Sequence, residues 1–350
     1  MIIKNRKIDN NNPPLIVAEV SANHQNSLNT IYKILNAAAK IGLEAVKFQT
    51  FDLDEMTINS RKSDFLIKKK IDNKQWQNKS LYNLYKKVQL PFSWHKKIFK
   101  RAKQLGLICF SSVFDEKSLI LLEKLNCPAY KIASLESLHF PLIEKVIMTK
   151  KPIIISTGTL EIGEIKELVN FVRKKKCSNF AILHCVTKYP ASAKDINLNK
   201  IKYYKKKFKC LVGFSDHTND IGSSIGAAAF GANIIEKHFK LSNSSKTLDS
   251  LFSIDPQKMS NLIIQTKIAW ESVGRINTNP DKTDKLYKFY RRSIYAVQDI
   301  KKNELLNKNN IKIIRPGNGL EPKYFNRILG KKTRQNISRG SPIKLSKIFI

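Results

Sequence analysis

The sequence predicts a (β/α)8 TIM barrel of the α/β class, followed by a small β-rich domain. Two observations carry the barrel. Eight short apolar segments alternate with helical segments, and strands that are apolar throughout are typical of parallel sheets buried on both faces. No G-x-G-x-x-G motif follows the first apolar segment, which disfavours an open dinucleotide-binding sheet.

The eight expected strands share a short apolar run that ends close to polar side chains. They lie at residues 15–20, 44–49, 107–111, 129–133, 152–156 and 180–185, from residue 211, and at residues 233–238. Between the second and third strands, residues 50–91 interrupt the rhythm. We interpret them as an inserted loop with helical pieces on the strand-exit side, where substrate contacts are common.

The expected helices alternate with these strands and carry end signals. Ser27 precedes the first helix and Gly42 follows it, as helix-capping preferences predict. Asp115 begins a later helix, and Pro256 begins the last one. Six helices are expected at residues 27–41, 93–105, 160–176, 196–208, 221–231 and 256–273. Two more are expected between the third and fifth strands, one that begins at residue 115 and one that ends near residue 150.

The two ends of the chain depart from the barrel pattern. Residues 1–14 are polar and rich in asparagine, which predicts a leader or a short hairpin. We assign residues 1–274 to the barrel, 275–290 to a charged linker and 291–350 to a β-rich module with Gly and Pro at its turns. A module of about 60 residues is small for independent stability, so we expect it to dock on a barrel.

Composition limits the class of protein. The chain has no basic and apolar N-terminal signal, and its apolar runs are too short to span a bilayer, so we expect a cytoplasmic protein without a membrane partner. The five cysteines form no C-x-x-C pair and are expected to be free thiols. The net charge of +35 suggests nucleic-acid binding as a hypothesis. The lysines, however, are spread over nearly every helix and form no patch interleaved with aromatic residues. We therefore expect no nucleic-acid partner.

The last two strands each end in a charged triplet, S-D-H and E-K-H. If both strands are parallel and joined by the helix between them, His217 and His238 emerge at the same end of the sheet. Two imidazoles beside carboxylates suit a divalent-metal site open to substrate. The competing interpretation is that each histidine is a solvated loop residue.

Other polar residues gather at the same strand ends, where active sites of this fold lie. They are Glu19, Lys47, Gln49, Ser111, Ser112, Lys131, Ser134, Ser156, Thr187, Ser215 and Glu236. Chance placement would not favour one end of eight strands, so these residues predict a functional site.

Seven motifs in this order resemble the sialic acid synthase family. They are A-E-V-S-A-N-H from Ala18, V-K-F-Q-T from Val46, K-I-A-S from Lys131, I-I-S-T-G from Ile154, H-C-V-T-K-Y-P from His184, G-F-S-D-H-T from Gly213 and I-E-K-H-F from Ile235. The tail, with R-P-G-N-G from Arg315, resembles the family's antifreeze-like (β-clip) domain. Residues 54–67 and the L-Y-N-L-Y stretch most resemble the pseudaminic acid synthase branch.

The resemblance implies a C–C bond-forming transferase. The family condenses phosphoenolpyruvate with an open-chain N-acetylated amino sugar, releases phosphate and forms a nine-carbon 2-keto acid. By resemblance His217 and His238 hold Mn²⁺ or Mg²⁺, and Arg315 reaches the sugar's acetamido group across a domain-swapped homodimer. The catalytic candidates are Glu19, Lys47, Lys131, Glu136 and Asp249. The candidates for substrate binding are Gln49, Ser112, Ser134, Ser156, Thr187, Tyr189, Ser215, Glu236 and Arg315.

Three departures from the family pattern affect the substrate more than the reaction. Val113 replaces a turn proline, T-L-D-S surrounds Asp249 in place of G-P-D-S, and Thr187 and Lys188 introduce an extra cation. The expected sugar is 2,4-diacetamido-2,4,6-trideoxy-altrose, and the mannose-type sugars of N-acetylneuraminate and legionaminate synthases are the alternative. Other 3-deoxy sugar-acid synthase barrels lack such a tail. A basic barrel that binds polyanions without catalysis is a further alternative.

Overall fold

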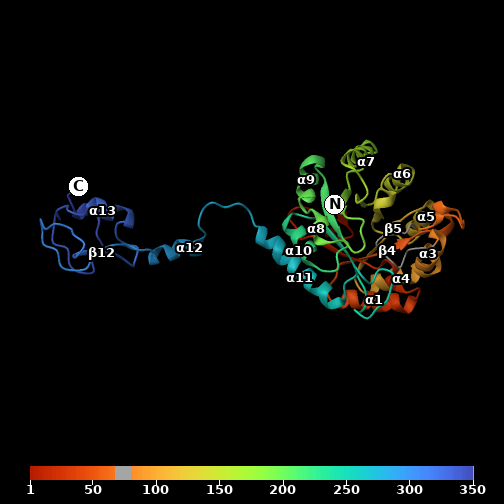
Figure 1. The fold of residues 1–350 in the computed structure, drawn as a ribbon, viewed down its shortest axis with the longest axis horizontal. Helices are drawn as coiled ribbons and strands as arrows, with labels where there is room; N and C mark the ends of the chain where they lie inside the picture. The colour runs from red at the N-terminus through yellow and green to blue at the C-terminus, as the bar shows by residue number, and fades with distance from the viewer. Residues whose placement is uncertain (68–79, 350) are drawn as a thin grey trace. The chain divides into compact units, whose positions relative to one another are not determined.

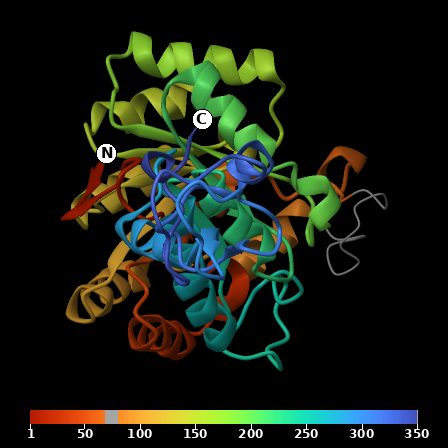
Figure 2. The same cartoon turned by 90° about the vertical axis from the view of Figure 1, so that its left-hand side faces the viewer.

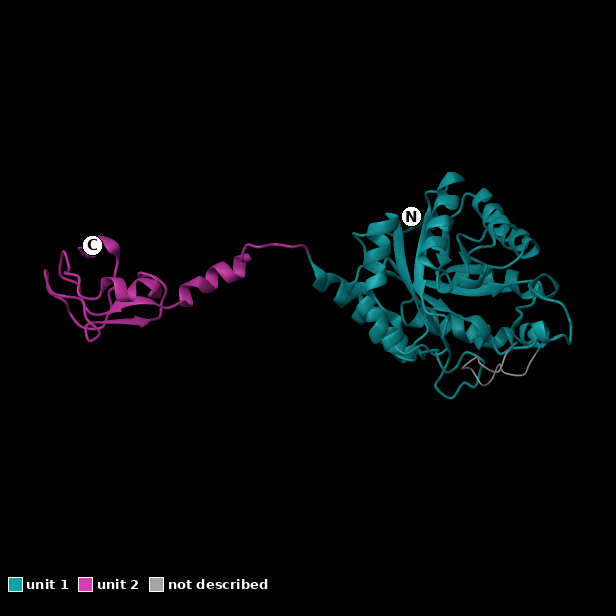
Figure 3. Ribbon diagram, turned by 45° about the horizontal axis from the view of Figure 1, so that its top comes forward, with its two compact units in different colours: residues 1–274 teal, residues 275–350 magenta. Residues whose placement is uncertain are grey.

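The structure, a computed structural model, describes residues 1–67 and 80–349. The chain divides into two compact units, Met1–Gly274 and Arg275–Ile350, which are described separately (Figure 3). None of the helices in these described ranges combines the length and the apolar character that crossing a membrane requires.

The first unit is a closed barrel of eight parallel strands, which confirms the predicted (β/α)8 fold (Figure 1). The strands run around the barrel in the order β10-β3-β4-β5-β6-β7-β8-β9. Their bounds are β3 (Leu15–Glu19), β4 (Ala45–Thr50), β5 (Ile108–Val113), β6 (Tyr130–Ile132), β7 (Ile153–Ser156), β8 (Phe180–Cys185), β9 (Leu211–Asp216) and β10 (Ile234–His238). At the closure β10 pairs with β3, so His238 lies beside Glu19.

Helices form the outer layer of the barrel around the strands (Figures 1 and 2). They are α1 (Leu28–Lys40), α4 (Phe92–Gln104), α5 (Glu116–Lys124), α6 (Phe140–Met148), α7 (Ile162–Lys174), α9 (Asn199–Phe208), α10 (Gly222–Ala229) and α11 (Pro256–Val273). Ser27, Asp115 and Asp255 cap three of them through side-chain acceptors. The helix expected at 196–208 is preceded by a short α8 (Ala193–Ile196), because Asn197 adopts a left-handed conformation between the two.

The N-terminal residues form an antiparallel hairpin of β1 (Ile2–Ile3) and β2 (Arg6–Lys7). Ile3 and Ile8 are buried in the barrel core. Lys4 Nζ donates to Leu107 O, and Asn233 Nδ2 donates to Asp9 O. Because both partners precede barrel strands, the hairpin covers the end of the barrel opposite the strand exits.

The insertion after β4 contains α2 (Leu53–Met56), the 3-10 helix η2 (Ser63–Phe65) and α3 (Leu81–Val88). Residues 68–79 of this predicted insertion lie outside the described residues. Two further 3-10 helices, η1 (Ser21–His24) and η3 (Ser134–Glu136), follow β3 and β6 at the same end of the barrel. Five short helical elements of the described residues therefore lie at the strand exits.

The second unit is small and has a core of its own. It comprises α12 (Lys282–Tyr287), η4 (Lys288–Tyr290), β11 (Ser293–Ala296), β12 (Ile311–Ile314), η5 (Pro322–Tyr324), α13 (Phe325–Ile328) and η6 (Leu345–Lys347). The expected linker thus contains the helix α12. Ile294, Ile311 and Ile343 are among the buried residues of the core. Arg315 follows β12 and is exposed.

Candidate active site

The side chains of β9 and β10 alternate between two faces, as strand geometry requires. Asp216 and Lys237 form a fully buried ion pair of 3.2 Å, and Ser224 Oγ donates to Asp216 Oδ2 at 2.6 Å. Ser224 belongs to α10, so this pair lies on the helix side of the strands. Asp216 therefore orients neither imidazole directly, because its carboxylate is engaged with Lys237 and Ser224.

The opposite face carries a set of ionised and hydroxyl side chains that we term the charged cluster. Its members are Glu19, Lys47, Ser112, Lys131, Ser215 and Glu236, all buried. Glu236 Oε2 lies 3.6 Å from Lys47 Nζ, and Glu236 Oε1 lies 3.4 Å from Lys131 Nζ. Ser215 Oγ donates to Glu236 Oε1 at 3.0 Å. Six different strand ends therefore bring these groups to one place.

Lys47 is the most connected member of the charged cluster. Its ammonium contacts the Glu19 carboxylate and donates to Ser112 Oγ at 3.0 Å. Burial lowers the pKa of Lys47 to about 7, against the attraction of Glu236, and Lys131 lowers it further. Burial alone would raise the pKa of Glu236, but Lys131 and Lys47 hold that pKa well below its usual value. Buried ion pairs contribute little net stability, so such a cluster indicates a functional role.

A group of small hydroxyls lies next to the charged cluster, after β6, β7 and β8. The Gly158 amide donates to Ser134 Oγ at 3.1 Å. A Cβ atom at Gly158 would lie 2.5 Å from Cys185 Sγ and 2.7 Å from Thr187 Oγ1, so only glycine fits there. Ser156 Oγ is buried and has no hydrogen-bond partner among the residues that the structure describes. A free hydroxyl of this kind suits an oxygen of a phosphate.

The two imidazoles lie close together, with ring centroids 5.6 Å apart. His217 Nδ1 donates to Val186 O at 2.8 Å, so Nε2 carries the lone pair of the ring and lies 3.4 Å from Ser215 Oγ. His238 Nδ1 is buried without a hydrogen-bond partner in the described part of the chain, 3.6 Å from Asp249 Oδ2. Burial lowers the pKa of His217 to about 4 and that of His238 well below its usual value. Both rings are therefore neutral near pH 7, as metal ligands must be.

These features fit a divalent metal held by two imidazoles. Within residues 1–67 and 80–349, no group of three His, Cys, Asp or Glu side chains is arranged to hold a metal ion. Further ligands would therefore come from water or substrate, which is the arrangement of an open, reactive site.

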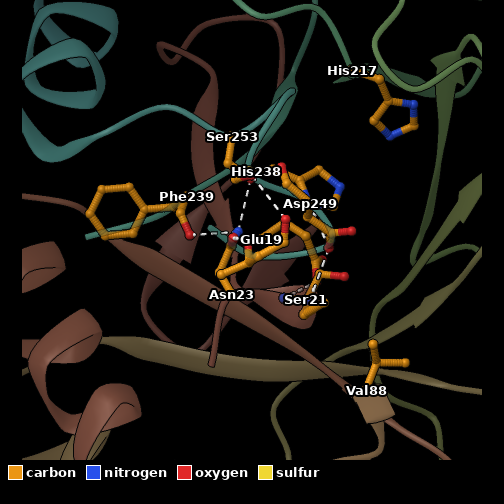
Figure 4. A network of polar contacts seen from close by, with 12 residues as sticks. Glu19, Ser21, Asn23, Val88, His217, His238, Phe239, Asp249 and Ser253 are labelled. Carbon is orange, nitrogen blue, oxygen red and sulfur yellow. Dashed lines mark hydrogen bonds and ion pairs between the residues drawn. The ribbon is translucent and has the colours of Figure 1, made fainter. Parts of the chain in front are cut away.

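A polar network joins the loops that follow β3 and β10 (Figure 4). Asn23 Nδ2 donates to Phe239 O at 3.0 Å and to Ser253 Oγ at 2.9 Å. The Ala22 amide donates to Asp249 Oδ2 at 3.1 Å. Burial raises the pKa of Asp249, whereas the hydrogen bonds from Ser21 and from the Ala22 amide lower it. Asn23 thus fixes the loop that presents Asp249 to His238.

A pocket of about 630 Å³ opens beside these groups and has two chemically different sides. One side contains the predicted residues Gln49, Ser134, Glu136, Thr187, Tyr189, His238 and Asp249, with the apolar Leu135, Leu248 and Phe252 among them. The other side comes mainly from the insertion and from β5, and it contains Phe51, Met56, Ile67, Leu81, Leu84, Tyr85, Val88 and Phe114. Burial raises the pKa of Glu136 to about 7, although its own backbone amide and Lys131 lower it.

Most of the predicted site residues therefore lie in one region of the barrel. Seven line the pocket, and the charged cluster, Ser156 and His217 lie next to it. Tyr189 packs against the His217 ring at 4.3 Å between ring centroids. Arg315 belongs to the other unit, so its role at this site stays a prediction.

Sequence reasoning missed two groups of residues. Asn23 is part of the A-N-H motif, but nothing in the motif shows that its amide bridges two loops. Leu81, Leu84, Tyr85 and Val88 have the spacing of a single helical face, and this signal could have identified the apolar side of the pocket. His184, which also ends a strand, instead packs between Tyr204 and Phe214, away from the pocket.

Comparisons with known proteins identify the family of the chain. Residues 34–278 match the NeuB family, and residues 291–348 match the SAF domain. The chain is 38% identical to the pseudaminic acid synthase of Helicobacter pylori, over 96% of this chain and 98% of that protein. It is 37% identical to the pseudaminic acid synthase of Campylobacter jejuni, over 95% of both.

A solved structure gives the same fold. The N-acetylneuraminic acid synthetase from Leptospira borgpetersenii, a complex with citrate, aligns with a TM-score of 0.72 and 29% identity. The alignment covers 82% of this chain and 94% of that chain.

Proposed function

Because the chain belongs to the NeuB family, we propose that it acts as a pseudaminic acid synthase. It would condense phosphoenolpyruvate with 2,4-diacetamido-2,4,6-trideoxy-altrose, release phosphate and form a nine-carbon 2-keto sugar acid. The observation that carries this proposal is the charged cluster, which holds two buried ammonium groups beside a pocket of sugar size.

Phosphoenolpyruvate carries a carboxylate and a phosphate, and the chain offers a suitable donor for each. The Lys47 and Lys131 side chains supply positive charge in a buried setting, where charge-assisted hydrogen bonds are strong. Because the pKa of Lys47 is about 7, a bound anion would favour the charged form of that side chain. Ser134, Ser156 and the small turn at Gly158 supply short donors around the phosphate oxygens. Glu236 holds both lysines in place and keeps them from moving apart.

The neutral imidazoles of His217 and His238 would hold Mn²⁺ or Mg²⁺ at the border between the charged cluster and the pocket. When bound, such a metal supplies Lewis-acid polarisation of the sugar aldehyde. Asp249 and Asn23 fix the loop around His238 and so set the direction in which the aldehyde enters.

The reaction also needs groups that bind hydroxyls and move protons. The enol carbon attacks the aldehyde, water then adds to the resulting cationic carbon, and phosphate leaves from the tetrahedral intermediate. Glu136 lines the pocket with a pKa near 7, so its carboxyl group exists in both protonation states at neutral pH. We propose that Glu136 and Asp249 bind the sugar hydroxyls and exchange protons with them.

The family resemblance adds a proposal about assembly. Arg315 would contact the sugar from the C-terminal domain of a second copy, in a domain-swapped homodimer. Light scattering on the full chain measures the mass directly, and a dimer mass is expected. A purely monomeric protein with full activity would contradict this part of the proposal.

Phosphate release from phosphoenolpyruvate tests the function. Metal-stripped protein is mixed with Mn²⁺ and, separately, with the altrose sugar, its mannose-type legionaminic counterpart and N-acetylmannosamine. We expect turnover with the altrose sugar alone. Turnover with a mannose-type sugar instead would keep the reaction and change the substrate. No metal-dependent release with any sugar would contradict the enzyme assignment and favour the polyanion-binding alternative.

A further inference from the structure

We propose that the apolar side of the pocket recognises the methyl group at C6 of a 6-deoxy sugar and discriminates against sugars with a 6-hydroxyl. The residues responsible are Phe51, Met56, Leu84, Val88 and Phe114, which we term the apolar wall. This inference rests on the proposed function, because it names a determinant of selectivity in the same pocket.

The first step is the contrast between the two sides of the pocket. His238, Asp249 and Glu136 lie on one side of the pocket. They are the ionisable groups that would contact the aldehyde and its neighbouring hydroxyls. The side chains of the apolar wall carry no N–H or O–H group and no charged oxygen. A sugar whose aldehyde lies at His238 therefore directs its other end toward the apolar wall, which offers no hydrogen-bond partner to a hydroxyl. Tyr85, whose ring packs on Phe51, carries a phenol on the same side of the pocket. In Figure 4, Val88 lies well apart from His238 and Asp249.

The second step is that the apolar wall is held in place. Phe51 is buried, and its ring packs edge-on against Tyr85 at 6.0 Å and against Phe114 at 5.8 Å. Gln89 Nε2 donates to Phe51 O at 3.2 Å and joins the end of α3 to the end of β4. His24 Nδ1 accepts the Asn26 amide, so His24 Nε2 donates to Val88 O at 3.1 Å. The wall is thus a preformed surface, which selectivity requires.

The apolar wall favours a methyl group over a hydroxyl in free energy. A methyl group gains free energy when it leaves water for such a surface, whereas a hydroxyl loses its hydrogen bonds to water without replacement. Apolar pockets discriminate between substrates that differ by one such group by about 10- to 100-fold in kcat/KM. We expect a preference of this size for the 6-deoxy sugar.

The experiment uses two sugars that differ by one oxygen. They are 2,4-diacetamido-2,4,6-trideoxy-altrose and its synthetic 6-hydroxy counterpart, each assayed by phosphate release from phosphoenolpyruvate. The variants are Met56→Gln, which keeps the length of the side chain, and Val88→Thr, which keeps its shape. Both add polar groups to the wall. The control is Ile58→Gln, because Ile58 belongs to the same loop, is 59% exposed and does not line the pocket.

In the wild type we expect the ratio of kcat/KM for the two sugars to favour the 6-deoxy sugar at least about tenfold. Val88→Thr and Met56→Gln should reduce this ratio severalfold or more, while Ile58→Gln leaves it unchanged. Thermal unfolding identifies a variant that fails to fold, and the other variant then decides.

The outcomes separate the inference from the proposed function. Wild-type protein that turns over neither sugar contradicts the proposed function itself. Wild-type protein that uses both sugars equally well leaves the function standing and overturns the role of the wall. The same conclusion follows if both folded wall variants keep the wild-type ratio.

Discussion

The charged cluster and the apolar wall border one site, but they are built in different ways. The cluster comes from six strand ends of the barrel, and each side chain is fixed by strand register and by ion pairs such as Lys131–Glu236. The wall comes mainly from the insertion after β4, whose path the barrel does not determine. Under the proposed function, the barrel supplies the reaction and the insertion supplies the choice of sugar. Variants in the two regions should therefore fail in different ways.

The largest effect is expected from Lys131→Met in the charged cluster. The substitution keeps the apolar stem and removes one ammonium group that would hold the phosphoenolpyruvate anion. Loss of one preorganised group of this kind costs about 10²- to 10³-fold in turnover. We expect kcat/KM to fall by that factor for every sugar, as measured by phosphate release.

Lys131→Arg is the matched control, because it keeps the charge and changes only its geometry. It should retain more activity than Lys131→Met at every sugar tested. If Lys131→Met instead altered sugar preference and spared the rate, the division between cluster and wall would be wrong.

The second effect concerns metal binding by His217. Removing one of two protein ligands should weaken Mn²⁺ binding by about 100-fold, since even residues behind the ligands contribute 10- to 100-fold. Titration calorimetry on His217→Ala measures this affinity directly. Activity of the wild type should disappear on chelation and return with Mn²⁺.

His184→Ala provides the matched control for this substitution. His184 also ends a barrel strand, but its Nε2 contacts Ile196 O among residues of the helix layer. The control should lower stability and leave the Mn²⁺ affinity unchanged. Equal loss of affinity in both variants would show that general loosening of the barrel, and not ligation, explains the result.

Much of the barrel and of the charged cluster could be predicted from sequence because strands impose a period of two. Ser215 and His217 share a face of β9, as Glu236 and His238 share a face of β10, so recognising the strands was sufficient to group them. The same rule, applied fully, would have placed Asp216 and Lys237 on the other face, where they pair.

The rest of the site depends on contacts between segments that are distant in sequence. Asn23 bridges to Ser253 across loops whose shapes no local pattern specifies. Val88 faces the pocket because α3 packs over the end of β4, which spacing along α3 alone cannot reveal. The residues of the wall were therefore recognisable as one helical face, but their target was not.

A smaller loss of activity is expected from Asn23→Ala. Asn23 belongs neither to the charged cluster nor to the apolar wall, and it supports the loop of Asp249. The substitution leaves Phe239 O and the loop of Asp249 without their shared donor, at a cost of about 1–3 kcal/mol in the free energy of unfolding. Urea unfolding measures that cost. Because Asn23 acts through Asp249, kcat should fall more than KM rises, and the preference for the 6-deoxy sugar should stay as in the wild type. A changed preference would place Asn23 with the wall.

The smallest effect is the pH dependence that Glu136 contributes to stability. Burial raises its pKa from 4.5 to about 7, so between these values the folded protein holds a proton that the unfolded chain releases. The free energy of unfolding must then fall as pH rises, by about 1 kcal/mol between pH 6 and pH 7 for this one group.

Glu136→Gln keeps the shape of the side chain and removes its titration, so the difference between variant and wild type isolates this contribution. The comparison is needed because the buried histidines act with the opposite sign below about pH 6.5, where the unfolded chain binds protons that the folded rings refuse. Urea unfolding at pH 6 and at pH 7 should show that the variant gains stability relative to the wild type as pH rises. Parallel pH profiles would mean that Glu136 is already ionised in the folded protein. The attraction of Lys131 in the charged cluster, and not burial in the pocket, would then set the protonation state of Glu136.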